Sequence, residues 1–140
     1  MAPAGPLTIY IDGSVLGNPG PGAIGVVVLN GAGQVVEAWG EAIGEVTNNQ
    51  AEYRALLAAL EKARRLGAAE VTIRSDSQLL VRQFSGEYRV KDAKLRPLHA
   101  RARALAGRFR SFRLEHIPRE ENRAADRLAN RARRANSEGG

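Results

Sequence analysis

The sequence predicts an α/β domain built on a five-stranded mixed sheet with helices on both faces. Three segments of β-strand character come first with no helical period between them, which indicates an antiparallel meander. After residue 47, helical segments alternate with two further strands, and strands joined by helical crossovers run parallel to one another. At 140 residues the chain is long enough for one domain with a substantial core.

The first half of the chain supplies the meander. The expected strands are Leu7–Asp12, Ala23–Leu29 and Gln34–Ile43. A glycine- and proline-rich loop, Gly13–Gly22, joins the first two, and Asn30-Gly31 is typical of a hairpin turn before the third.

The second half supplies the helices and the parallel strands. Thr47 or Asn48 can cap a helix over Ala51–Leu66, which Gly67 ends. Asp92 can cap a later helix whose first part is interrupted or shifted by Pro97. The remaining elements are a strand at Glu70–Ser75, helices at Ser77–Phe84, Ala93–Ala106 and Ala124–Arg134, a strand at Phe109–Ile117, and a loop at Pro118–Asn122. We expect a single domain over residues 1–140, with a core at about 7–134 and flexible ends at 1–6 and 135–140.

Composition narrows the class of protein. The net charge is +6, and most of the arginines lie between Arg96 and Arg134. Such a basic surface favours binding of polyanions, of which nucleic acid is the first candidate. A solvated, arginine-rich surface without a partner would give the same net charge and is the alternative. The absence of cysteine excludes disulfides and thiolate chemistry. No apolar run is long enough for a membrane span, and no secretion signal is evident, so we expect a cytoplasmic protein without a membrane partner.

Four stretches carry an acidic residue that a hydrophobic core does not need. Asp12 and Asp76 follow the buried runs Leu7–Ile11 and Val71–Ile73, and a carboxylate there is costly unless a cation lies beside it. Glu52 and Asp126 lie in the first turns of two predicted helices. Carboxylates that converge from separate elements are the ligands that Mg²⁺ and Mn²⁺ prefer, so the pattern predicts a metal-dependent enzyme.

These stretches, in this order, resemble the motifs of the type 1 ribonuclease H family. The matching segments are Tyr10-Ile-Asp-Gly-Ser, Gly17-Asn-Pro-Gly-Pro-Gly, Thr47-Asn-Asn-Gln-Ala-Glu-Tyr, Ser75-Asp-Ser-Gln and His116-Ile-Pro-Arg-Glu-Glu-Asn-Arg-Ala-Ala-Asp-Arg-Leu-Ala. The resemblance covers roughly Leu7 to Ala132 and implies a ribonuclease H-like fold. It also implies an endonuclease that hydrolyses the RNA strand of RNA–DNA hybrids and leaves 5′-phosphate and 3′-hydroxyl ends.

The resemblance assigns roles to particular residues. Asp12, Glu52, Asp76 and Asp126 would be catalytic carboxylates that hold two Mg²⁺ ions, for which Mn²⁺ can substitute, and His116 would be the family's mobile catalytic histidine. Histidine side chains can exchange a proton near neutral pH, which suits proton transfer or product release, while a loop histidine that only hydrogen-bonds is the alternative.

Short polar side chains next to the acids suit the minor groove of a hybrid duplex. We expect Asn18, Thr47, Asn49 and Gln78 to bind substrate there. Asn18 and Thr47 look like the family's pocket for a phosphate of the DNA strand. Helix capping is the alternative role for Thr47 and the asparagines after it.

The chain departs from many family members in one segment. Residues 87–94 are short and only mildly basic, so the family's basic handle looks absent, and the sequence is similar to compact, handle-less members. Double-stranded RNA therefore stays open as a further substrate. A non-catalytic hybrid-binding module would lack an acid, and none is missing. Polynucleotidyl transferases and resolvases on this fold usually carry three acids with different neighbouring motifs and often oligomerise, whereas here we expect a monomer.

Overall fold

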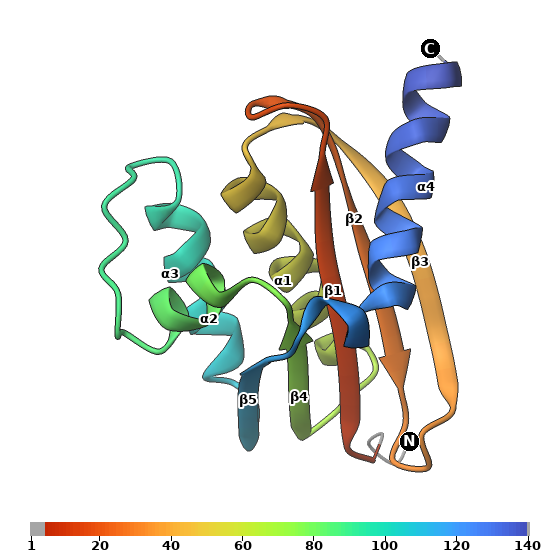
Figure 1. Cartoon of the computed structure of the whole chain (residues 1–140). Helices are drawn as coiled ribbons and strands as arrows, with labels where there is room; N and C mark the ends of the chain where they lie inside the picture. The colour runs from red at the N-terminus through yellow and green to blue at the C-terminus, as the bar shows by residue number, and fades with distance from the viewer. Residues whose placement is uncertain (1–4, 140) are drawn as a thin grey trace.

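The computed structural model describes the backbone of residues 5–139 and the side chains of residues 5–136. Five strands and four α-helices make up the fold (Figure 1). In chain order they are β1 (Leu7–Val15), β2 (Gly20–Leu29), β3 (Val35–Val46), α1 (Asn48–Arg65), β4 (Glu70–Ser75), α2 (Gln78–Phe84), α3 (Arg96–Ala106), β5 (Ser111–His116), a short 3₁₀ helix at Arg119–Glu121, and α4 (Arg123–Gly139).

The sheet has the predicted mixed topology. Its strand order is β3-β2-β1-β4-β5, with the β1–β2 and β2–β3 pairs antiparallel and the β1–β4 and β4–β5 pairs parallel. The carboxyl ends of β1, β4 and β5 therefore meet at one edge of the sheet, which is where sites form in such sheets. The parallel ladder between β1 and β4 ends at Ile11 and Ser75, so Asp12 and Asp76 both lie one residue beyond it.

One face of the sheet packs against α1 and forms the main core. Alternating residues of β1 and β2 point to this face, because side chains of a strand alternate between its two sides. Ile9 and Ile11 of β1 pair with Val28 and Val26 of β2, and all four are buried. Helix α1 contributes buried apolar residues at helical spacing: Tyr53, Leu56, Leu60 and Ala63.

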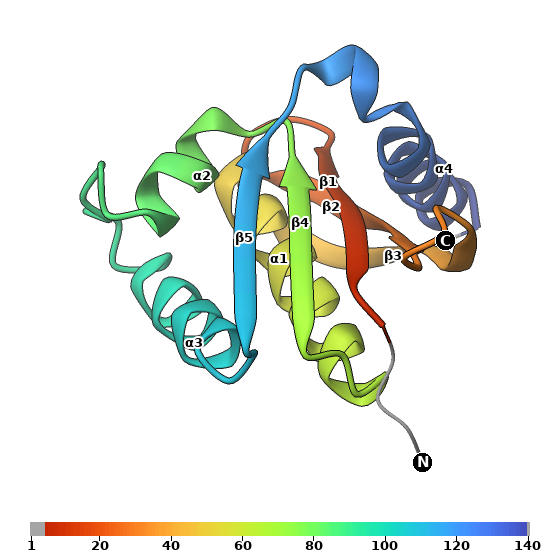
Figure 2. The same ribbon diagram turned by 90° about the horizontal axis from the view of Figure 1, so that it is seen from below.

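Helix α4 packs on the opposite face, over β1, β2 and β3, and Figure 2 shows it across the sheet from α1 and α3. Its inward face is made of small residues, with Ala125 and Ala129 fully buried. Gly25 of β2 lies directly beneath them, where a Cβ atom would come within 2.0 Å of the carbonyl oxygen of Ala125. Because Gly25 pairs with Asp12 of β1, this close approach places the first turns of α4 beside Asp12.

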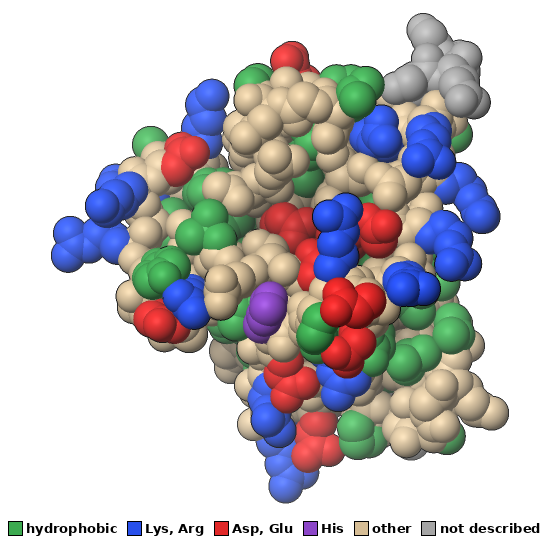
Figure 3. Space-filling model, in the orientation of Figure 1, with side chains coloured by type: hydrophobic (Ala, Val, Ile, Leu, Met, Phe, Trp, Pro, Cys, Tyr) green, Lys and Arg blue, Asp and Glu red, His purple; other side chains and the backbone are tan. Residues whose placement is uncertain are grey.

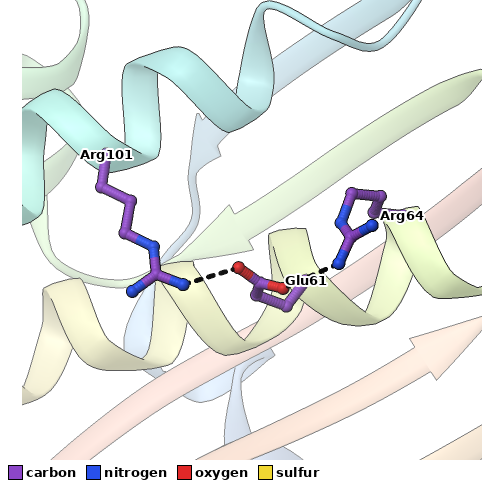
Figure 4. A network of polar contacts seen from close by, with 3 residues as sticks. All are labelled: Glu61, Arg64 and Arg101. Carbon is purple, nitrogen blue, oxygen red and sulfur yellow. Dashed lines mark hydrogen bonds and ion pairs between the residues drawn. The ribbon is translucent and has the colours of Figure 1, made fainter.

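Helices α1 and α3 are also linked by charged side chains. Arg101 of α3 lies 2.9 Å from Glu61 of α1, and Arg64 approaches the same carboxylate at 3.4 Å (Figure 4). The two guanidinium groups lower the pKa of Glu61. Such exposed pairs contribute little stability in water, so the apolar contacts between these helices hold them together. In the described part of the chain, no helix has the length and apolar character needed to cross a membrane.

Several predicted boundaries were wrong. β1 continues past Asp12 to Val15, because its antiparallel ladder with β2 extends to the pair Val15–Gly22. β2 already begins at Gly20, because this residue pairs with Val46 of β3. The helix predicted from Ala93 begins at Arg96, with Pro97 in its first turn, where a missing N–H costs nothing. Asp92 instead closes the preceding turn, accepting a hydrogen bond from the backbone N–H of Lys94.

Flexible ends were predicted at residues 1–6 and 135–140, after a helix ending at Arg134. α4 extends beyond Arg134 to Gly139. Residues 1–4 and 140, where we predicted flexible ends, lie outside the described residues.

Candidate active site

Three of the four predicted acids form one cluster at the carboxyl edge of the parallel strands. Asp12, Glu52 and Asp76 each offer a carboxylate oxygen, and the three oxygens lie within 4.8 Å of one another. They come from β1, from the first turns of α1 and from the residue after β4. Asp126 lies outside this triad but lines the same cleft from α4. The fold thus brings together all four acids that the sequence singled out.

Hydrogen bonds position three of the four carboxylates. The backbone N–H of Gly13 donates a 2.6 Å hydrogen bond to Oε1 of Glu52, and a Cβ atom on Gly13 would lie 2.7 Å from that oxygen. Glycine is therefore needed at position 13 for the carboxylate to reach the strand. Asn122 donates through Nδ2 to Oδ2 of Asp76 at 3.1 Å, and Asn130 donates to Oδ1 of Asp126 at 3.2 Å.

The electrostatics of the cluster are unfavourable without a cation. Burial, followed by the charges of Glu52 and Asp76, raises the pKa of Asp12 from 3.8 to about 9. Burial and the charge of Asp76 raise the pKa of Glu52 from 4.5 to about 8. Both shifts mean that the folded chain resists full ionisation of the cluster, since like charges in a buried site repel.

The donor set fits divalent cations. Oε2 of Glu52 is buried and has no hydrogen-bond partner, a costly state for a carboxylate oxygen. Hard oxygen ligands from several carboxylates are what Mg²⁺ and Mn²⁺ prefer. A cation bound by Asp12, Glu52 and Asp76 would both pair that oxygen and remove the repulsion.

The cluster lies in a cleft of about 340 Å³. Besides the four acids, its lining comprises Gly13, Asn48, Asn49, Ser77 and Arg119. Figure 3 shows acidic side chains gathered near the middle of this face, partly covered by a basic side chain. The cleft thus presents carboxylates, amides and one guanidinium group to a ligand.

The predicted substrate-binding residues lie around this cleft in different ways. Asn49 lines it directly. Thr47 is the N-cap of α1 and forms a capping box with Gln50, so the predicted capping role is present. Asn18 is exposed, and its Oδ1 accepts from the backbone N–H of Asn48, which ties the loop after β1 to the start of α1. Gln78 is exposed at the first position of α2.

His116 lies on β5, the strand next to the one that leads to Asp76. It ends β5 opposite Ser75, is exposed, and is not part of the cleft lining. The structure therefore places it at the edge of the sheet that carries the acids, on the neighbouring strand.

Two residues near the acids were not predicted. Arg119 lines the cleft from the 3₁₀ helix, and Asn122 is buried with 1% exposure beside Asp76. Both belong to the segment Pro118–Asn122, which the sequence predicted only as a loop. An arginine and an asparagine within ten residues of Asp126 were the available signal in the sequence, but their contacts depend on the tertiary fold.

Comparison with known proteins places this fold and cleft in a family. Residues 10–132 match the reverse transcriptase-like family. Ribonuclease HI of Halobacterium salinarum is 46% identical over 123 residues, which cover 88% of this chain and 62% of the relative. The bifunctional protein Rv2228c of Mycobacterium tuberculosis is 46% identical over 90% of this chain and 35% of its own length. The chain thus spans less than two thirds of these relatives.

Solved structures agree closely with the fold. The N-terminal ribonuclease H domain of Rv2228c from Mycobacterium tuberculosis superposes with a TM-score of 0.91 at 44% identity, covering 96% of this chain and 97% of that one. LC11-RNase H1, crystallised in complex with an RNA/DNA hybrid, has a TM-score of 0.87 at 40% identity and covers 93% of this chain and 98% of that one. Together with the matched sequence motifs, these similarities show that the chain belongs to the type 1 ribonuclease H family.

Proposed function

We propose that this protein is an endonuclease that hydrolyses the RNA strand of RNA–DNA hybrids, leaving 5′-phosphate and 3′-hydroxyl ends. The observation that carries the proposal is the triad of Asp12, Glu52 and Asp76, whose carboxylate oxygens lie within 4.8 Å of one another in an open cleft. The hybrid bound to the similar LC11-RNase H1 supports the choice of substrate.

The residues that would hold two Mg²⁺ ions are Asp12, Glu52, Asp76 and Asp126, with Mn²⁺ as a substitute. Bound divalent cations supply Lewis-acid chemistry: they favour ionisation of an attacking water and neutralise the charge on the leaving 3′ oxygen. The chain's own task is to hold four carboxylates together in one cleft. Gly13 and Asn122 do this by donating hydrogen bonds to Glu52 and Asp76.

Other residues would position the duplex. Asn49, in the cleft, and Gln78, at the start of α2, offer amide groups to the minor groove, which carries 2′-hydroxyls in the RNA strand. The pair of Asn18 and Thr47 lies where α1 begins, and we propose that it contacts a phosphate of the DNA strand. His116, exposed at the end of β5, would accept or deliver a proton as product leaves.

We further propose that residues 7–134 form one ribonuclease H domain, which acts as a monomer in the cytoplasm. Sedimentation of the purified chain would give its mass, and a dimer at micromolar concentration would contradict the monomer.

A cleavage assay tests the function. Labelled RNA–DNA hybrid, single-stranded RNA, double-stranded RNA and double-stranded DNA would each be incubated with the wild type and with Asp76→Asn, in Mg²⁺, Mn²⁺ or EDTA. We expect metal-dependent cutting of the RNA strand of the hybrid, lost in the variant and in EDTA. Hybrid binding without cutting would contradict the enzyme and favour a binding module, and equal cutting of double-stranded RNA would widen the substrate class.

A further inference from the structure

A stripe of arginines runs along the outer side of α4. Arg123, Arg127, Arg131 and Arg134 line one groove of about 580 Å³ together with Asp126 and Asn130. At 100° per residue these four arginines fall within a sector about 80° wide, and the first and last are about 16 Å apart along the helix. The four arginines therefore form a continuous basic stripe that starts beside Asp126, a carboxylate of the active-site cleft.

The four guanidinium groups are exposed and have no carboxylate of their own. Among the side chains of residues 5–136, none of them forms an ion pair or a side-chain hydrogen bond. Other arginines are already paired: Arg101 with Glu61 (Figure 4) and Arg74 with Glu115. In Figure 3, basic side chains gather along the α4 side of the acidic centre.

The electrostatics of the cleft explain why such a strip is useful. Four carboxylates repel a phosphate backbone, and the segment between α2 and α3, residues 85–95, forms no helix that could serve as a basic handle. Screening confines useful attraction to charges within about 10 Å at 0.1 M salt. Arg123 and Arg127 lie close to the cleft, because they share a groove with Asp126, which also lines the cleft.

We propose that the α4 arginine stripe binds the phosphate backbone of the hybrid duplex on the side of the cleft where α4 lies, and so takes the place of the missing handle. This inference rests on the proposed function, because it assumes a nucleic-acid duplex in the cleft. Phosphate contacts position a duplex without reading its sequence. The stripe therefore contributes affinity and salt dependence, whereas the acids carry the chemistry.

The test compares two double variants of the full-length chain that remove the same charge. Arg127→Gln with Arg131→Gln removes the middle of the stripe. Arg108→Gln with Arg110→Gln is the matched control, because both residues are exposed and precede β5 at its amino end. A six-residue strand separates that end from the carboxyl edge by about 20 Å, twice the screening length.

Binding would be measured in an Asp76→Asn background, so that the hybrid stays intact, by fluorescence anisotropy from 50 to 200 mM salt. Each lost phosphate contact reduces the slope of log K against log salt by about 0.9, which corresponds to about 8-fold in affinity at 0.1 M. We expect the α4 variant to bind about 10- to 60-fold more weakly, with a slope reduced by nearly 2, for hybrids of any sequence. The control should bind as the parent does.

Equal affinity and equal slope for the two double variants would overturn the proposal. Thermal melting of each variant checks that it is folded. Cleavage of the hybrid by the chain with Asp76 intact distinguishes a failure of the proposed enzyme activity from a failure of the proposed binding surface. If that chain binds hybrid with the predicted salt slope but cuts nothing, the proposed enzyme activity fails while the binding surface stands. If it cuts and the α4 variant binds normally, only the surface fails.

Discussion

Asn122 gives the sharpest test of how the site is built. Its side chain is buried, and Nδ2 donates to two acceptors: the carbonyl oxygen of Ile11 at 2.8 Å and Oδ2 of Asp76 at 3.1 Å. One amide thus connects the end of β1, Asp76 of the acidic triad and the start of α4. Replacement by alanine removes both hydrogen bonds and leaves the Ile11 carbonyl without this donor.

The expected cost follows from these two contacts. A buried carbonyl that loses its donor costs about 1–3 kcal/mol, and a hydrogen bond to an ionised carboxylate contributes about 1.5–3 kcal/mol. Asn122→Ala should therefore lower the free energy of unfolding by about 3–5 kcal/mol, which lowers Tm by roughly 10–20 °C for a domain of this size. Because residues that orient metal ligands typically contribute 10- to 100-fold in metal affinity, Mg²⁺ binding should weaken by about that factor.

Urea unfolding and Mg²⁺ titration of the melting temperature measure the two effects separately. Asn136→Ala is the control, because Asn136 is exposed at the far end of α4 and should change stability by less than about 0.5 kcal/mol. A variant at position 122 that unfolds like the wild type, and whose Tm rises over the same range of Mg²⁺, would refute the reasoning that Asn122 supports Asp76.

Three other changes test the cleft, the packing of α4 and the cap of α1. Without metal, the raised pKa of Asp12 means that the folded chain keeps a proton that the unfolded chain releases above about pH 4, so stability falls as pH rises toward 9. The Asp12→Asn variant should therefore have a higher melting temperature than the wild type at pH 8 and the same melting temperature at pH 4. Equal melting temperatures at both pH values would contradict the raised pKa. Gly25→Ala forces a methyl group against Ala125 and should cost about 1–3 kcal/mol in urea unfolding; an unchanged midpoint would show that α4 can move away freely. Thr47→Ala removes the capping box and should cost about 1 kcal/mol, with Thr47→Ser retaining most of the stability.

Much of the fold follows from local sequence patterns. The β-branched run at Val71–Ile73 predicts a buried strand. The helical crossover before it makes that strand parallel to β1. Once the two are neighbours, Asp12 and Asp76 must meet at the same edge. The convergence of the acids was thus predictable because it depends on strand direction and on position within each strand.

Other features depend on contacts between distant segments and could not be predicted. Asn122 is 111 positions from Ile11, and nothing in the local pattern of Pro118–Asn122 indicates that its amide is buried. The start of α3 was misjudged because a hydrogen-bonded turn at Asp92 resembles a helix cap in sequence. Similarly, the position of Asp126 relative to the triad depends on how closely α4 approaches the sheet. Gly25 and the buried alanines of α4 together determine that distance.

Three sides of helix α4 carry residues with three different roles: packing on the sheet, supplying the fourth acid, and forming the basic stripe. Its alanines must be small for the helix to lie against Gly25, and this approach brings Asp126 into the cleft with Asn130 holding its carboxylate. The arginines occupy an adjacent side: Arg123, three positions before Asp126, is its neighbour on the helix surface, and the other three arginines continue along the helix from there. A displacement of α4 would therefore move the fourth acid and the basic stripe together. For this reason, the packing beneath the helix should affect both catalysis and duplex binding, although no residue of that packing contacts the substrate.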